Sequence, residues 1–282
     1  MIQFSRSVKI WLFASLCSLL VWVIYMFPSN FQHLFNVVSG KQDFYTGNLG
    51  VLLSRLAGLW TRFGGVVLAL TAAFLVCAGG TVKPRSSLVE RIVEAALFLE
   101  GTYHVLLFPS GLWWLGLGLN FLGVAFLMQA VFAGVPIMLL SFKVRLEDKA
   151  KVLKWAGVAA VGYAAALWFN VVFRWFDMIE VVGHSFLFKG VASWSFLGSM
   201  ITLSVAVVFA VAGAYLLTEN KGESIKWFGF SLLMIGVHYV IYLAYSLSSG
   251  NLDLALTIDV WTLPFLGLGA ALLKTKTDKT IL

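Results

Sequence analysis

Two ionisable side chains, Glu100 and His104, lie four residues apart inside a long apolar stretch, residues 92–108. In a helix this spacing places both side chains on one face. A carboxylate beside an imidazole can relay protons, orient a ligating histidine or form an internal ion pair. Because ionisable groups are costly in hydrocarbon, we expect this face to point into a helix bundle, a cavity or a cofactor.

A second histidine, His238, lies in another long apolar segment, residues 227–245. Both segments are predicted to run outward across a membrane, with His104 and His238 near their outer ends. Two imidazoles at similar depth could hold a b-type haem or a metal ion. Arg62 and Arg174, predicted at the outer interface, could bind haem propionates or approach Glu100. The alternative is that each histidine only hydrogen-bonds a neighbouring helix.

The other two histidines, His33 and His184, are predicted in outer loops that follow the first and fifth apolar segments. They are further candidate metal ligands. Arg174 has helical spacing to Asn170 and Asp177, which are four residues before it and three residues after it. This spacing also allows a simple ion pair that anchors the helix at the interface.

The composition places the chain among polytopic membrane proteins. Of its 282 residues, 60% are apolar and only 12% are charged, and the apolar residues form repeated long runs. These runs are continuous instead of alternating, so an all-α bundle is expected in place of a β-barrel. The net charge of +7 comes from residues between apolar segments, which indicates topology signals and not a nucleic-acid surface. We expect one transmembrane domain over residues 1–282 and no soluble domain.

About eight transmembrane helices are expected. A tight turn is predicted at residues 109–111, a kink at Pro136, and an amphipathic interfacial helix over residues 49–60. The predicted spans are residues 10–27, 64–80, 87–108, 112–142, 155–172, 194–217, 227–245 and 260–273.

The lysines and arginines predict the topology. Fifteen of the 20 fall on one side when the N-terminus is placed inside, many of them in the connector of residues 143–154. Because positive residues concentrate in cytoplasmic loops, we predict a multi-pass protein of the cell membrane with both termini in the cytoplasm. The five residues predicted on the outer side are Lys41, Arg55, Arg62, Arg174 and Lys189.

Residues 1–145 and 146–282 have features of two repeat halves with four helices each. The sequence Trp114-Leu-Gly-Leu-Gly-Leu resembles Phe265-Leu-Gly-Leu-Gly-Ala, 151 residues later. The two histidines inside apolar segments fall in the third helix of each half. Four helices per half in the same orientation would form a parallel internal repeat. Chance similarity between helices rich in Leu and Gly is the alternative.

The function predicted from these features is that of a non-catalytic integral membrane subunit of a larger, redox or respiratory type of assembly. Its His–Glu polar site would lie near the outer face, and other membrane subunits and the lipid bilayer would be its partners. The sequence lacks the HExxH, GxSxG and Walker-type patterns, so an enzyme acting alone is not expected. The alternatives are a structural scaffold and a secondary transporter or channel that uses Glu100 as its proton-coupling carboxylate. A transport path needs polar groups or broken helices in both membrane halves. The inner halves of the predicted spans contain few polar groups, which argues against transport.

Overall fold

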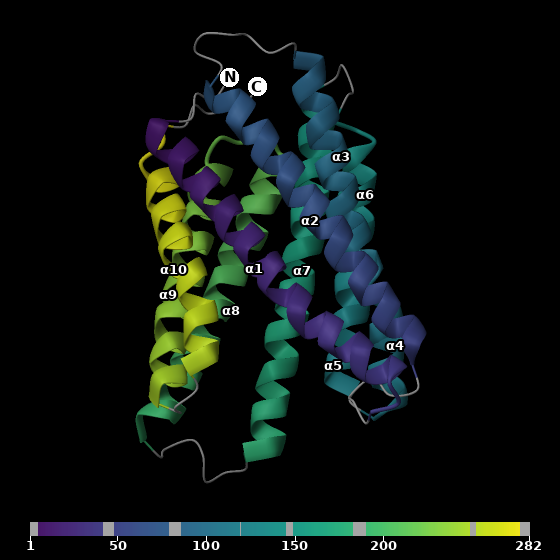
Figure 1. Cartoon of the computed structure of the whole chain (residues 1–282). Coiled ribbons are helices and arrows are strands. Elements are labelled where there is room, and N and C mark those ends of the chain that lie inside the picture. The colour runs from purple at the N-terminus through teal and green to yellow at the C-terminus, as the bar shows by residue number, and fades with distance from the viewer. Residues whose placement is uncertain are drawn as a thin grey trace. The chain divides into compact units, whose positions relative to one another are not determined.

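A computed structural model describes residues 5–41, 48–78, 86–118, 120–144, 149–182, 190–248 and 252–276. This part of the chain is built from helices (Figure 1), which confirms the all-α class. Six helices within it are long and apolar enough to cross a membrane, so the chain has the character of a multi-pass membrane protein. The predicted number of eight spans stays a prediction.

The chain divides into two compact units, which are described separately below. One unit comprises Leu19–Glu147, and the other comprises Met1–Ser18 together with Asp148–Leu282. Helix α1 (Arg6–Val38) crosses the boundary and contributes its first residues to the second of these units. The predicted internal repeat stays a prediction.

In the unit Leu19–Glu147, α3 (Ser86–Val105) continues almost directly into α4 (Phe108–Gly116). The expected turn at residues 109–111 is therefore wrong. Pro109 occupies the first turn of α4, where its missing N–H costs no helical hydrogen bond. The chain turns instead near Leu117 and Gly118, and the positive φ of Gly118, 80°, is a conformation that suits glycine.

Helices α3 and α4 form one rod of a helical hairpin. The second rod consists of α5 (Asn120–Met128), a π-helical segment η1 (Gln129–Gly134) and α6 (Val135–Ser141). The fourth span was expected to begin at residue 112, but residues 108–116 belong to the preceding rod. The kink was expected at Pro136, and the irregular turn lies just before it. Pro136 cannot donate a helical hydrogen bond, and a wider π-turn accommodates such a gap.

Glycines bring the two rods of this hairpin close together at two crossings. At the first, a Cβ on Gly101 would lie 2.8 Å from the Met138 backbone nitrogen and 2.9 Å from the Gly134 carbonyl oxygen. At the second, a Cβ on Gly111 would lie 2.9 Å from the Gly123 carbonyl oxygen. Only glycine permits such close backbone approach, and small residues of this kind are characteristic of helix contacts in membranes.

Helices α1 and α2 (Leu49–Ala78) are longer than the sequence analysis predicted. Pro28 lies inside α1, so the first span does not end at residue 27, and His33 lies in this helix instead of a loop. Residues 49–60 and 64–80 were expected to form separate segments, but α2 is continuous through residue 78. Its Leu52 side chain is fully buried in a core cluster with Trp114. This burial explains why the start of α2 is not an exposed interfacial helix.

The second unit is organised around α9 (Ser224–Ser248), which packs against both α8 (Gly190–Thr218) and α10 (Leu252–Leu273). Helix α7 (Lys149–Val182) packs against α8. Close approach again depends on glycine, since a Cβ on Gly269 would lie 2.8 Å from the Gly229 carbonyl oxygen. The start of α1 completes this unit through Val8, which is buried with residues of α10.

Candidate functional site

The unit Leu19–Glu147 contains a cluster of ionisable side chains that we call the Glu100 cluster: Arg62, Glu100 and His104. The Glu100 Oε1 atom lies 3.4 Å from Arg62 Nη2 on α2 and 3.4 Å from His104 Nε2 on α3. The side chains of Arg62, Glu100 and His104 are 13%, 24% and 5% exposed. One carboxylate oxygen therefore faces both nitrogen groups, and the cluster links two helices that pack against each other.

Two aromatic rings hold the Arg62 guanidinium. Its central carbon lies 4.3 Å from the ring centre of Tyr103 and 5.0 Å from that of Trp22. Rings attract cations through their electron-rich faces, and the attraction grows when water is excluded. Trp22 belongs to α1, so the guanidinium joins three helices of the unit. Together with Glu100, these rings compensate the mostly buried Arg62 guanidinium for its lost hydration.

His104 occupies the Glu100 face of α3, as its four-residue spacing predicts. Its ring also contacts Tyr103 edge to face, with centroids 5.0 Å apart. Its Nε2 atom faces a carboxylate one helical turn earlier. Such a pair suits either a fixed internal ion pair or a proton relay, because an imidazole can exchange a proton with a carboxylate.

His238 has a different environment in the second unit. Its Nδ1 atom lies 2.9 Å from both the hydroxyl and the carbonyl oxygen of Ser199 on α8. The His238 ring stacks on Tyr242 with an interplanar angle of 10°. These contacts match the alternative in which a histidine hydrogen-bonds a neighbouring helix. They also fix the ring, as a hydrogen bond at Nδ1 does for histidines that ligate metals through Nε2.

The predicted partnership between His104 and His238 stays a prediction. The two side chains belong to different units, His104 to α3 and His238 to α9. Their contacts differ in one respect that matters for a shared haem. His238 is fixed through Nδ1, whereas His104 faces its carboxylate neighbour through Nε2, the nitrogen that most often ligates a metal.

The structure describes the remaining candidate ligands only in part. Arg174 lies in α7, and its side chain is outside the described part. His184 lies outside the described residues altogether, and His33 is partly buried in α1. Among the described residues, no three His, Cys, Asp or Glu side chains come together as a metal site would require. The metal role of His33 and His184 stays a prediction.

Sequence reasoning missed three residues that surround these sites: Trp22, Tyr103 and Ser199. Tyr103 had a detectable signal, since it follows Glu100 by three residues on the same helix. Trp22 had no local signal, because its contact with Arg62 joins helices that are distant in sequence. Ser199 is one of many serines in apolar segments, and only the packing of α8 on α9 brings it to His238.

Comparison with known proteins gives no relative. No protein-family model matches the chain, and no curated protein and no solved structure is detectably similar to it.

Proposed function

We propose that this chain is a non-catalytic integral membrane subunit of a larger membrane assembly, with the Glu100 cluster as its internal polar site. One observation carries the proposal: a single oxygen of the Glu100 carboxylate lies 3.4 Å from both Arg62 Nη2 and His104 Nε2. A carboxylate that is neutralised by fixed neighbours suits a site that holds the helices in place for a partner subunit. The non-catalytic part rests on the sequence patterns, in which HExxH, GxSxG and Walker-type motifs do not occur.

Redox assemblies are the first class of partner to test. Histidines in apolar helices are the usual means by which membrane subunits hold haem. His238 supports this choice, since the contacts at its Nδ1 fix the ring, as they do for histidines that ligate metals through Nε2. A haem would supply one-electron chemistry, while this chain would supply the ligating imidazole of His238 and the Tyr242 ring stacked on it.

The experiment is purification of the tagged chain from its native membranes in a mild detergent. We expect a second polypeptide at a fixed molar ratio, and visible spectra before and after dithionite then show whether haem is present. A Glu100→Gln variant is expected to lose the partner, whereas Glu219→Gln, which changes an exposed carboxylate at the end of α8, should retain it. A chain that purifies alone in both forms contradicts the proposal.

A proton-coupled transporter is the second candidate, and the helix interruptions favour it. The rod that carries Glu100 is interrupted between α3 and α4, and its partner rod contains the π-helical segment η1. Transporters use interrupted helices of this kind around their coupling residues. Proteoliposomes with a pH gradient and an entrapped pH dye test this candidate. Transport predicts proton flux that Glu100→Gln abolishes, while the subunit proposal predicts equal background flux in both proteins.

A further inference from the structure

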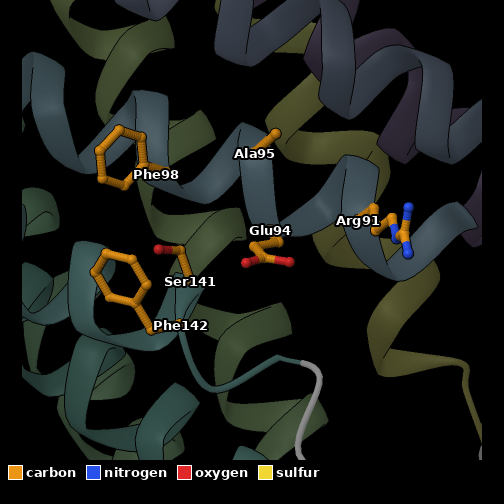
Figure 2. Close-up of a pocket in the computed structure, with 6 residues that line it drawn as sticks. All are labelled: Arg91, Glu94, Ala95, Phe98, Ser141 and Phe142. Atoms are coloured by element: carbon orange, nitrogen blue, oxygen red, sulfur yellow. The ribbon is translucent and has the colours of Figure 1, made fainter. Parts of the chain in front are cut away.

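A pocket separate from the Glu100 cluster lies between the start of α3 and the end of α6. Its volume is about 300 Å³, and its lining residues are Arg91, Glu94, Ala95, Phe98, Ser141 and Phe142. Figure 2 shows the Glu94 carboxylate between Arg91 on one side and the two phenylalanine rings on the other. The pocket therefore has a charged part and an aromatic part.

The aromatic part is continuous with the apolar surface. Phe98 and Phe142 form an edge-to-face pair with ring centroids 5.9 Å apart. Their side chains remain 38% and 61% exposed, although both belong to helices long and apolar enough to span a membrane or directly follow one. In a bilayer such exposed rings contact acyl chains, so a lipid can enter this end of the pocket from the side.

The charged part includes the cation Arg91 and the anion Glu94. Arg91 and Glu94 are three residues apart on α3, so both project from one face. They lie three and six residues after the start of the candidate span at Leu88, or about 4.5 and 9 Å along the helix axis. If the bilayer surface lies at the start of this span, these positions correspond to the depth at which headgroups meet acyl chains.

We propose that this pocket binds a zwitterionic phospholipid with a primary amine in its headgroup. The Arg91 guanidinium matches a phosphate, with which arginine forms paired charge-assisted hydrogen bonds. The Glu94 carboxylate matches an ammonium group, and Phe98 and Phe142 contact the first part of an acyl chain. A carboxylate beside the phosphate-binding guanidinium favours a lipid that carries an ammonium group next to its phosphate over an anionic lipid that has none.

Ser141 lines the pocket, but its hydroxyl is not exposed to a lipid headgroup. Its side chain is 1% exposed, and its hydroxyl donates to the Met138 carbonyl oxygen at 2.6 Å. The hydroxyl hydrogen is thus used within α6 and the residue is almost fully buried, so headgroup recognition depends on Arg91 and Glu94. This lipid site goes beyond the proposed function, because it requires neither a partner subunit nor a cofactor.

The test is native mass spectrometry of the purified chain with phospholipids that share the same acyl chains. The headgroups form a series: ethanolamine, its mono- and dimethyl derivatives, choline and glycerol. Each methyl group removes one N–H donor, so we expect binding to fall stepwise from ethanolamine to choline, by about tenfold over the series. Equal binding of ethanolamine and choline lipids, or tighter binding of the glycerol lipid, overturns the proposal.

Variants then assign the two charges. Glu94→Gln should remove the preference for ethanolamine over choline, and Arg91→Gln should weaken all of these phospholipids alike. Glu219→Gln, at the exposed end of α8, is the matched control and should bind as the unsubstituted chain does. An unchanged ethanolamine preference in Glu94→Gln overturns the role of that carboxylate. The headgroup series needs no variant, so it stays decisive if a substituted chain fails to fold.

Discussion

Arg62 on α2 and Glu100 on α3 form an ion pair in which Arg62 Nη2 lies 3.4 Å from Glu100 Oε1. Both residues lie within helices that are long and apolar enough to span a membrane. The same carboxylate oxygen faces His104, and the guanidinium lies over two aromatic rings. The opposite charges of Arg62 and Glu100 therefore neutralise each other within one unit of the chain.

Removing one partner of this pair should destabilise the unit. We expect Glu100→Gln to lower the free energy of unfolding by somewhat less than the about 3–5 kcal/mol typical of fully buried pairs, since Glu100 is 24% exposed. Replacing both partners, as in Arg62→Met with Glu100→Leu, should recover most of the loss because no charge is left alone. Thermal unfolding in detergent measures both. Additive losses in the double variant would show that the pair has no coupling.

The glycine crossing between α3 and α6 should tolerate no added carbon. In Gly101→Ala the new Cβ would meet the Met138 backbone at 2.8 Å, so we expect a loss of about 1–3 kcal/mol from overpacking. Gly116→Ala is the matched control, since a Cβ there meets nothing within 4 Å. Thermal unfolding of the two variants compares them. Equal stability would mean that the rods do not cross at Gly101.

The contact between His238 and Ser199 should depend more on the histidine than on the hydroxyl. We expect Ser199→Ala to cost only about 0.6 kcal/mol, an average for hydrogen bonds between membrane helices, because His238 Nδ1 keeps the Ser199 carbonyl at 2.9 Å. His238→Ala should cost more, since it also removes the ring stacked on Tyr242. Unfolding in detergent measures both, and a larger effect of Ser199→Ala would refute this ranking.

The predicted topology requires Lys149 and Gly250 to lie on opposite sides of the membrane. Single cysteines at these positions, in a chain without Cys17 and Cys77, should react with an impermeant reagent from opposite faces of sealed vesicles. The physical reason is that most lysines and arginines fall on the predicted inner side. Reaction of both positions from one face would show that the number or order of spans is different.

The sequence predicted well what depends on local pattern. Long apolar runs predicted the helices, and the four-residue spacing of Glu100 and His104 predicted their shared face. The predicted boundary between the third and fourth spans was wrong because Pro109, Ser110 and Gly111 together resemble a turn. Pro109 is equally suited to the first turn of a helix. Whether residues 109–111 form a turn or a helix depends on packing between the rods, where Gly111 approaches Gly123.

The surroundings of the candidate site depend on packing between helices and could be predicted only in part. Trp22 is 40 residues from Arg62 in the sequence, and no spacing rule connects residues of different helices at that separation. Likewise, the start of α2 looked amphipathic because Arg55 and Arg62 share a face. In the structure that face points inward, where Arg55 lies 5.8 Å from the Phe126 ring centre and Arg62 meets Glu100.

The central claim, that the Glu100 cluster is the polar site on which an assembly depends, is tested most directly by exchanging its charges. The measurement is the molar ratio of partner polypeptide to this chain after purification from native membranes. We predict a lost partner for Arg62→Glu alone and partial recovery of the ratio for the double exchange, Arg62→Glu with Glu100→Arg, which restores the ion pair but not the ring contacts of Arg62. Retention of the full ratio by Arg62→Glu alone would contradict the claim.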